Sequence, residues 1–405
     1  MTVSQMARSI KESPTLKLNA TAARLREQGQ PVIHLGGGEP KSKAPADAIR
    51  SCVDGLEPGE VRYSPAAGLP ALKEAIVRYT AEHYHKAVQP ANVVVSSGAK
   101  QAIMSVLHCI LEHGDEVIYP APYWVSYPEM VRIAGGTPVA VVPTDGSLQP
   151  TARDIAAAMR ASTRAVILNS PNNPSGVLYS EELIADIVAL CEKRGIWLIM
   201  DDIYNRLVFD GKRAPNPYLF AHDELERSRL VVVQGVSKMY AMTGFRIGWS
   251  VVNRELAQAM ANVQSHTTSG PATPSQWAAI GALSGAQSPI DDLRVALEYN
   301  RNVLVERLRT IDGVRVTPPD GTFYCFPDFR AHEHDSQKLA MFLLEKVRVV
   351  TVPGAEFGMD GHLRLSFCGS TQDVTEGTDR IRWALDPSAP RELDIGGRKL
   401  VRDWT

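Results

Sequence analysis

The sequence contains few cysteines and no long apolar run. Its 405 residues include 5 cysteines, Cys52, Cys109, Cys191, Cys325 and Cys368. None forms a Cys-x-x-Cys pair, so neither a zinc site nor a disulfide framework is expected. No apolar stretch approaches the roughly 20 residues that a membrane span needs, and residues 1–5 lack the basic-then-apolar pattern of a signal peptide. We therefore expect a cytoplasmic protein with reduced thiols, no metal and no membrane association.

An excess of charge of either sign is also missing. The 43 Lys and Arg residues nearly balance the 45 Asp and Glu residues, which leaves a net charge of -2. This balance gives no reason to expect nucleic acid or an anionic membrane as a partner. With 44% apolar and 22% charged residues the composition is that of a globular protein. The length allows a large core and two lobes.

The middle of the chain alternates strand and helix patterns. Helical segments lie between the strands, such as the one from about Lys100 to the stop at Gly114 and the one capped by Ser180 and ended by Gly195. This order predicts an α/β fold with a mostly parallel seven-stranded sheet and helices on both faces. The predicted strands are residues 93–95, 116–119, 138–142, 165–168, 196–200, 230–234 and 246–252.

The pattern changes character from about Gly285 onward. A long helical stretch, 291–308, is followed by a strand-rich part around 322–326. We expect this part to join the N-terminal arm in a smaller α+β domain. The predicted division is 1–45 for the arm, 46–290 for the large domain, 291–386 for the small domain and 387–405 for a polar, loosely packed tail.

Polar residues follow several of the predicted parallel strands. Asn173, Asp201, Tyr204 and Lys238 all come after strand ends. In open parallel sheets the ligand binds outside the carboxyl ends of the strands. The shared position of these residues therefore predicts the active site.

The most informative segment is the run 235–246, which contains Lys238. It follows the β-forming stretch 230–233 and also contains Ser237 and Arg246. An amine that attacks a carbonyl needs a rigid position and nearby positive charge that lowers its pKa. The hydroxyl and the guanidinium suit a phosphate. A Schiff-base lysine beside a phosphate site indicates the cofactor pyridoxal 5'-phosphate (PLP).

Four motifs in this order and spacing resemble those of the class I aminotransferases, which are PLP enzymes of fold type I. The resemblance extends over almost the full length of the chain. The motifs are Asn169-Ser-Pro-Asn-Asn-Pro-Ser-Gly176, Asp201-Asp-Ile-Tyr204, Ser237-Lys238 through Thr243-Gly-Phe-Arg246, and Arg364-Leu-Ser-Phe-Cys368.

The resemblance implies roles for the residues at the strand ends. Lys238 would bind PLP covalently and move the substrate proton, and Asp201 would pair with the pyridinium nitrogen that makes PLP an electron sink. Asp202 competes for the second role, but the family spacing to Tyr204 favours Asp201. Tyr204 and Asn173 would donate hydrogen bonds to the phenolic oxygen of the cofactor.

A phosphate site would combine Arg246 and Ser237 with the turn that contains Gly98, Ala99 and Lys100. Glycine there permits close backbone approach, and the start of the following helix offers free N–H groups.

Further family positions concern the ring and the substrate. Tyr63 resembles the tyrosine that reaches the phosphate from the neighbouring subunit, which implies a homodimer with shared active sites. Trp124 resembles the aromatic residue that stacks on the ring, although core packing is the alternative. Arg364 and the backbone of Gly38 would bind the α-carboxylate of the substrate.

Within the family, the sequence is similar to the bacterial aspartate aminotransferases that include aspartate/prephenate enzymes. In that subgroup Lys100 would bind the distal carboxylate, and a basic residue at Lys11 accompanies use of prephenate. Two positions depart from the usual pattern. Residues 41–43 read Lys-Ser-Lys instead of aspartate-aromatic-aspartate, and Gly235 replaces a small hydroxyl residue.

The expected function is transfer of an amino group between aspartate, or a related amino acid, and 2-oxoglutarate by a ping-pong mechanism. An aromatic or kynurenine-type aminotransferase or a PLP-dependent β-lyase is the alternative on the same fold. A PLP-binding regulator would need a DNA-binding domain, and only some thirty residues precede Gly36.

Overall fold

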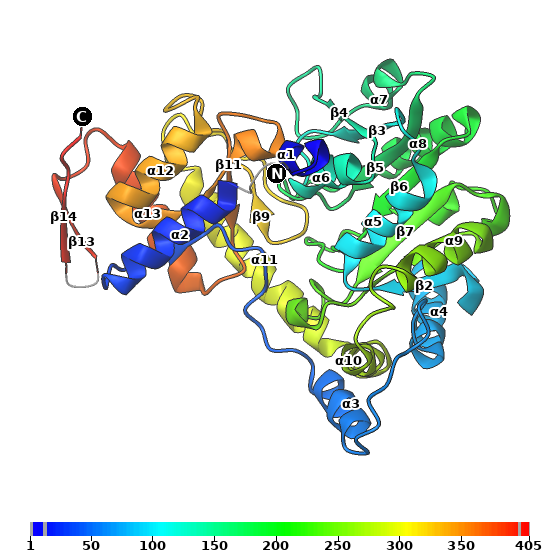
Figure 1. Ribbon diagram of the computed structural model, residues 1–405. Coiled ribbons are helices and arrows are strands. Elements are labelled where there is room, and N and C mark those ends of the chain that lie inside the picture. Colours follow the sequence, from blue (N-terminus) through cyan, green and yellow to red (C-terminus); the bar gives the residue numbers. More distant parts are fainter. Residues whose placement is uncertain (1–2, 11–13, 396–397, 405) are drawn as a thin grey trace.

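The computed structural model describes residues 3–10, 14–395 and 398–404, and its largest element is a seven-stranded sheet (Figure 1). All strand pairings are parallel except those of β8, which runs antiparallel to both of its neighbours. The expected fold class is therefore confirmed. The order is β2 (Val93–Ser96), β8 (Gly248–Val251), β7 (Leu230–Gly235), β6 (Trp197–Asp201), β5 (Thr163–Asn169), β3 (Glu116–Pro120) and β4 (Thr137–Val141).

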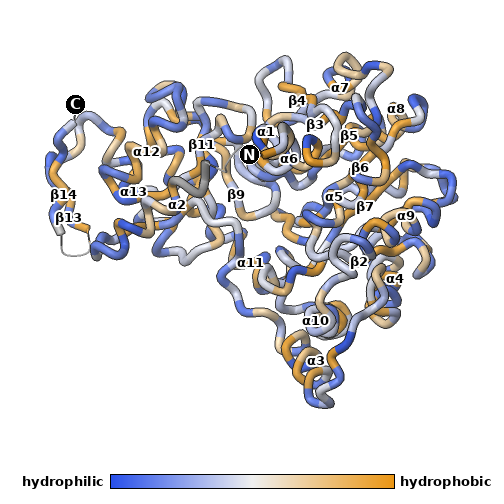
Figure 2. The backbone as a smooth tube through the Cα atoms, in the orientation of Figure 1, coloured by the Kyte–Doolittle hydropathy of each residue, from blue (hydrophilic) through white to orange (hydrophobic). Residues whose placement is uncertain are grey.

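Alternate residues of these strands are buried against opposite faces of the sheet. Val93 and Val95 belong to the core on one face, whereas Val94 belongs to the core on the other, as the two-residue period of a strand requires. Because both faces are covered, the strands are apolar throughout, and Figure 2 shows them mainly in the hydrophobic colours. The first face is covered by α4 (Pro70–Tyr84), α8 (Glu181–Arg194) and α10 (Thr273–Ser284), and the second by α5 (Ala99–Ile110), α6 (Ser126–Ile133) and α9 (Arg254–Ser265).

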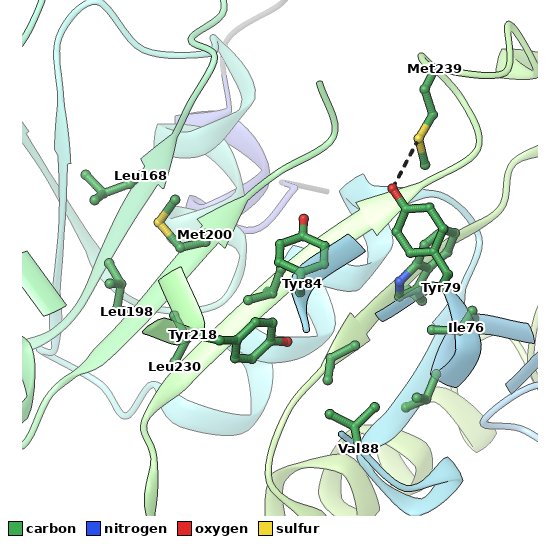
Figure 3. Close-up of a cluster of buried hydrophobic side chains, with 14 of the residues drawn as sticks. Ile76, Tyr79, Tyr84, Val88, Leu168, Leu198, Met200, Tyr218, Leu230 and Met239 are labelled. Carbon is green, nitrogen blue, oxygen red and sulfur yellow. Dashed lines mark hydrogen bonds between the residues drawn. The ribbon is translucent and has the colours of Figure 1, made fainter. Parts of the chain in front are cut away.

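The core on the first face anchors the segment that contains Lys238. Met239 is 1% exposed and accepts a contact of 3.6 Å from the hydroxyl of Tyr79, drawn as the dashed line in Figure 3. Tyr84 and Tyr218 meet edge to face in the same core, with ring centroids 5.6 Å apart. Each fully buried large apolar side chain contributes roughly 1.5–3 kcal/mol. The residue after Lys238 is thus fixed by the main core of the protein.

Local signals explain where the helices begin and end. The hydroxyl of Ser180 accepts a hydrogen bond from the Leu183 amide at 3.1 Å and caps α8. Gly195 ends this helix with φ 66°, a left-handed conformation that glycine adopts without a Cβ penalty. Helix α5 ends at Ile110, before the predicted stop at Gly114, because Leu111 is already extended.

The N-terminal arm and the C-terminal third share a separate core. Leu18 and Leu35 of the arm pack in one cluster with residues such as Leu343, Val349 and Leu365. The strands here form two small sheets, β1 (Ile33–His34) with β10 (Val349–Val350), and β11 (Val352–Pro353), β12 (Leu363–Ser366) and β9 (Tyr324–Cys325). The helices are α2 (Pro14–Glu27), α11 (Ser288–Leu308), α12 (Ser336–Val347) and α13 (Thr371–Leu385).

The polar composition led us to expect a loosely packed C-terminal segment. The segment instead forms a hairpin. Strands β13 (Glu392–Ile395) and β14 (Arg398–Val401) pair antiparallel at one end of the molecule (Figure 1). Trp404 packs edge to face against Phe342 and Trp383, with centroid distances of 5.3 and 5.5 Å. This aromatic contact holds the end of the chain against α12 and α13.

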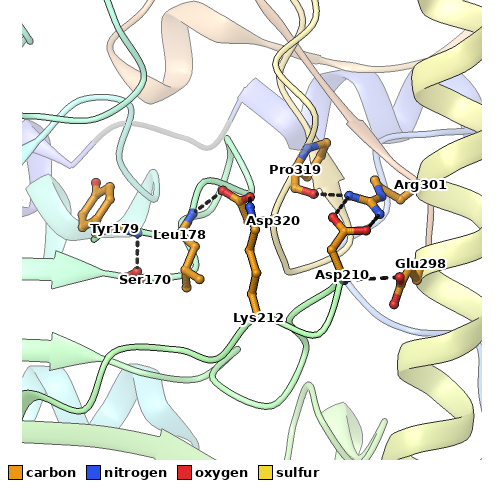
Figure 4. A network of polar contacts seen from close by, with 9 residues as sticks. All are labelled: Ser170, Leu178, Tyr179, Asp210, Lys212, Glu298, Arg301, Pro319 and Asp320. Atoms are coloured by element: carbon orange, nitrogen blue, oxygen red, sulfur yellow. Dashed lines mark hydrogen bonds and ion pairs between the residues drawn. The ribbon is translucent and has the colours of Figure 1, made fainter. Parts of the chain in front are cut away.

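Polar contacts connect helix α11 and the loop before β9 to loops of the large sheet (Figure 4). Arg301 donates to both carboxylate oxygens of Asp210, at 2.6 and 2.8 Å, and to the Pro319 carbonyl at 3.1 Å. Asp320 accepts from Lys212 at 2.6 Å and from the Leu178 amide at 3.1 Å. The chain that leads into β9 is therefore fixed relative to the loops at the strand ends.

The remaining helices are α1 (Gln5–Ser9), α3 (Ala46–Leu56), α7 (Ala152–Ala158) and the 3-10 helices η1 (Pro90–Asn92), η2 (Pro217–Leu219), η3 (Leu225–Arg227), η4 (Thr243–Phe245) and η5 (Gly354–Phe357).

Within the residues described, no helix is both long and apolar enough to cross a membrane.

Candidate active site

A cavity of about 1590 Å³ lies between the large sheet and the part formed by the N-terminal arm and the C-terminal third. It lies outside the carboxyl ends of β5, β6 and β7. Its position agrees with the expectation for an open parallel sheet. Its walls include most of the residues that the sequence singles out, namely Gly38, Ala99, Lys100, Trp124, Asn173, Asp201, Tyr204, Ser237, Lys238, Arg246 and Arg364.

Lys238 lies in the loop after β7 and reaches into this cavity. Its Nζ atom donates a hydrogen bond to the carbonyl of Gly38 at 2.6 Å. Burial, with help from the nearby charges of Arg364 and Arg246, lowers the pKa of Lys238 to about 8. At pH 7 about a tenth of this amine is thus free of its proton, far more than of an ordinary lysine, and a nucleophile or a base needs that form.

Asp201 is the last residue of β6 and is 4% exposed. Its carboxylate accepts a hydrogen bond from the Tyr127 hydroxyl at 2.7 Å, and its backbone carbonyl accepts one from Asn169 at 2.7 Å. Burial raises the pKa of Asp201 to about 6, although Tyr127 and the charge of Lys238 oppose this shift. A buried carboxylate of this kind favours a cation as its neighbour.

The neighbouring Asp202 lies away from the cavity. Its carboxylate accepts a hydrogen bond from the Tyr84 hydroxyl at 2.8 Å, within the core on the first face of the sheet. Successive residues at a strand end point to opposite sides. Of the two aspartates, only Asp201 lines the cavity.

Arg364, from β12, forms the wall on the side of the small sheets. Its two terminal nitrogens donate to the Asn173 side chain and to the Gly36 carbonyl, both at 3.1 Å. The residue is 8% exposed, and its Nε atom has no hydrogen-bond partner within the described part of the chain. A buried N–H without a partner is costly, so the guanidinium keeps a donor that the protein itself does not satisfy, in a residue that lines the cavity.

A second cationic region surrounds the start of α5. Arg246 has a left-handed backbone (φ 56°), and its guanidinium donates to the Thr243 carbonyl at 2.9 Å. Gly98 has φ 87°, a backbone conformation that strains any residue with a Cβ atom, and the Arg246 guanidinium lies 2.7 Å from where that atom would be. Lys100 lies over the Trp124 ring, 4.9 Å from its centroid, and burial together with Arg246 lowers its pKa. Free helix N–H groups beside an arginine suit a phosphate.

The two departures from the family pattern have local structural reasons. A Cβ atom at Gly235 would lie 2.7 Å from the Ile247 carbonyl oxygen, so no hydroxyl residue fits at this position. Lys41 forms an ion pair with Asp373 at 3.1 Å and therefore ties the segment after Gly38 to the start of α13.

Among the predicted site residues that the structure describes, Gly98 and Tyr63 do not line the cavity, and Tyr63 is 94% exposed. Lys11 lies outside the described residues. Conversely, sequence reasoning missed Tyr127, which binds Asp201, and Tyr324, which lines the cavity beside Arg364. The sequence signal that could have indicated Tyr127 is its position three residues after Trp124.

The sheet order, the buried lysine at a strand end and the acid that shares its cavity are those of a fold type I PLP enzyme. A family model described as aminotransferase class I and II matches residues 30–381. The chain belongs to this aminotransferase family.

Individual relatives agree with this family. A probable aspartate/prephenate aminotransferase of Aquifex aeolicus is 39% identical over 93% of this chain and 97% of its own length. The crystal structure of the Thermotoga maritima aspartate aminotransferase is 36% identical, with a TM-score of 0.88 over 94% of this chain and 99% of that one. The aspartate aminotransferase of Rhizobium meliloti gives a TM-score of 0.90 at 35% identity, over 94% of this chain and 98% of that one.

Membership of this family implies PLP as the cofactor, and the cavity fits that group. The guanidinium of Arg364, the buried carboxyl of Asp201 and the start of α5 beside Arg246 offer partners for a carboxylate, a cationic ring and a phosphate. Among the residues that the structure describes, no cluster of His, Cys, Asp or Glu could bind a metal ion.

Proposed function

We propose that this aminotransferase transfers an amino group between aspartate and 2-oxoglutarate by a ping-pong mechanism. One observation carries the proposal: Lys238 and Arg364 line the same cavity. An α-amino acid held by its carboxylate at Arg364 would present its Cα toward Lys238.

The residues that would hold PLP surround Lys238. Arg246, Ser237 and the backbone at Gly98, Ala99 and Lys100 would bind the phosphate, as the cationic region at the start of α5 supports. Asp201 would bind the ring nitrogen, Tyr204 and Asn173 the phenolic oxygen, and Trp124 the ring face. When bound, PLP supplies an electron sink that stabilises negative charge at the substrate Cα.

The protein's own groups would then perform three tasks. Arg364 would bind the α-carboxylate, together with the backbone of Gly38. Lys238, whose pKa is lowered to about 8, would take the proton from Cα and return it at the end of the transfer. Contact around the cavity between the large sheet and the part formed by the arm and the C-terminal third would exclude water while the proton moves.

The choice of a dicarboxylic substrate is supported by Lys100 and by the relatives. Lys100 lines the cavity as a second cation, beside Trp124, where a distal carboxylate could bind. The relatives reported above are named aspartate or aspartate/prephenate aminotransferases, which favours this reaction over the β-lyase alternative. Prephenate as an additional acceptor rests on that name and on Lys11 in the sequence.

We also propose that the enzyme is a cytoplasmic homodimer with shared sites. The exposed Tyr63 would complete the phosphate site of the partner subunit. The five unpaired cysteines agree with a reducing compartment. The separate cores support a large domain of residues 46–290 and a small domain of 291–386 with the 1–45 arm, and the hairpin lies within 387–405.

A donor and acceptor screen of the PLP-loaded enzyme tests this proposal. Aspartate with 2-oxoglutarate is expected to be the most efficient pair, ahead of aromatic amino acids, and Lys238→Ala is expected to lose several orders of magnitude in kcat. Cleavage of cystathionine without use of 2-oxoglutarate would refute transamination. Near-normal turnover by Lys238→Ala would refute the role of the lysine.

A further inference from the structure

The guanidinium of Arg364 lies close to two aromatic rings that the family motifs do not include. Its carbon is 4.3 Å from the centroid of the Tyr324 ring and 5.1 Å from that of Phe357. Both rings are buried, Tyr324 at 2% and Phe357 at 1% exposure. They come from different elements, β9 and η5. The rings therefore shield the cation from water while its Nε edge stays unpaired.

Tyr324 has a second contact, with the residue proposed to bind the cofactor oxygen. Its hydroxyl lies 3.5 Å from that of Tyr204, at the long end of hydrogen-bond distance. The same hydroxyl lies 3.5 Å from the point where a Cβ atom at Gly38 would be. One side chain thus contacts Arg364, Tyr204 and the space above the Gly38 backbone.

Phe357 is fixed from the other side of the cavity. Its carbonyl accepts a hydrogen bond from the Tyr123 amide at 3.1 Å, in the segment that contains Trp124. Its ring meets Phe326 edge to face at 5.7 Å and shares a small core with Val352. The ring beside Arg364 is thus connected to the large sheet as well as to its own domain.

Two kinds of partner orient Arg364: hydrogen-bond acceptors and aromatic rings. The side chain of Asn173 and the carbonyl of Gly36 bind the terminal nitrogens, which fixes the rotation of the fork within its plane. The rings attract the cation, and this attraction is stronger when water is excluded. An arginine held in this way loses little freedom when a carboxylate binds its remaining edge.

We propose that Tyr324 and Phe357 are positioning residues that set the affinity of Arg364 for the substrate α-carboxylate, and that Tyr324 also connects this site to the hydroxyl of Tyr204. The inference rests on the proposed function because it takes an amino acid as the substrate. It assigns both residues a role in binding and not in the proton transfer at Cα.

Single variants separate the ring contacts from the hydroxyl contact. In the PLP-loaded enzyme, Tyr324→Leu and Phe357→Leu should each raise KM for aspartate about tenfold and leave kcat within about threefold. Tyr324→Phe keeps the ring, so KM should stay within about twofold. Because it removes the acceptor of the Tyr204 hydroxyl, that hydroxyl is free to donate to the cofactor oxygen, and the pH midpoint of the visible cofactor band should fall.

Phe329→Leu is the matched control. Phe329 is a fully buried phenylalanine of the same region, in the core that the arm shares with the C-terminal third. It is expected to lower thermal stability as Phe357→Leu does, without a change in KM. If Phe357→Leu does not fold, Phe357→Met, which has a similar volume and no ring, is measured instead and should raise KM in the same way.

An equilibrium measurement distinguishes failure of this inference from failure of the proposed function. Binding of a non-reactive C4 dicarboxylate to the PLP-loaded protein should weaken about tenfold in Tyr324→Leu and Phe357→Leu, even if aspartate proves a poor donor. If both variants bind it like the parent and lose only stability, the rings are structural and the inference is wrong. An unshifted visible band in Tyr324→Phe would overturn the connection to Tyr204.

Discussion

Two adjacent aspartates illustrate how position alone gives the same residue type different properties. Asp201 faces the cavity, where Lys238 shares the wall, whereas Asp202 lies in the opposite core beside Tyr84. Burial and the adjacent charge of Asp201 raise the pKa of Asp202 to about 7, although the hydrogen bond from Tyr84 opposes this shift. At pH values between the ordinary aspartate pKa and this raised value, the carboxyl of Asp202 is therefore largely neutral, whereas that of an exposed aspartate is ionised.

This shift predicts a specific dependence of stability on pH. Between the ordinary aspartate value of 3.8 and about 7, the unfolded chain releases the Asp202 proton and the folded protein keeps it. The contribution of Asp202 to stability is therefore lost as pH rises through this window, on the order of 2–4 kcal/mol in total. Asp202→Asn resembles the protonated form and lacks the titration.

Urea unfolding of the cofactor-free protein measures the effect. The midpoint of the parent minus that of Asp202→Asn should fall as pH rises from 4 to 7.5, because other carboxyl groups cancel in the difference. A difference that is constant over this range would show that Asp202 titrates normally.

Sequence reasoning located the residues of the cavity well because chemistry restricts them. Lys238, Asp201 and Arg364 stand in short motifs with fixed spacing, and all three line one cavity. Tyr324 and Phe357 were not predicted. Their contacts with Arg364 join separate segments of the chain, and no local pattern records such a contact.

At the scale of elements, the seven strands of the sheet were predictable because each is a short, largely apolar run between turn or helix signals, and several are rich in β-branched residues. In the small sheets, β9 (Tyr324–Cys325) lies in the part that the sequence predicted to be strand-rich. The two-residue strands β1, β10 and β11 were not predicted, since two residues give no periodicity. The C-terminal hairpin was also missed. Its position depends on Trp404, a single aromatic residue in a polar segment.

The connection between α11 and the large sheet should contribute measurably to stability. The Arg301 side chain is 6% exposed, and Asp210→Ala would remove its bidentate partner (Figure 4). We expect a loss of about 2 kcal/mol in the free energy of unfolding, at the lower end for buried pairs because Asp210 is 47% exposed. Chemical denaturation of the variant measures this loss.

The exposed ion pair of Lys399 with Glu392, with side chains 69% and 57% exposed, provides the control. Lys399→Ala should change stability by less than about 0.5 kcal/mol. Adding Arg301→Met to Asp210→Ala should recover part of the loss, because a methionine needs no carboxylate. Equal effects of Asp210→Ala and Lys399→Ala would contradict a structural role for the buried pair.

At the scale of the whole molecule, the position of Tyr63 predicts a shared site. It is 94% exposed, and other exposed apolar residues precede it within a short stretch of sequence, Ile49, Val53, Leu56 and Val61. Exposed apolar residues are frequent at subunit interfaces. If Tyr63 completes the partner's phosphate site, then Tyr63→Ala and Lys238→Ala damage different sites of a mixed dimer.

Mixing the two inactive variants tests this arrangement. Half of the randomly formed dimers would be hybrids with one intact site, so activity should recover to about a quarter of the parent value. The same variants kept separate provide the baseline. No recovery after subunit exchange, with exchange verified by mass, would contradict a site formed by two subunits.

The most direct test of the account is the identity of the lysine that binds the cofactor. The PLP-loaded protein is reduced with borohydride, which makes the link between lysine and cofactor permanent, and the labelled peptide is identified after digestion. The account predicts label on the peptide that contains Lys238 and none in Lys238→Ala. Label on another lysine such as Lys100, or a protein that stays colourless after incubation with PLP, would contradict it.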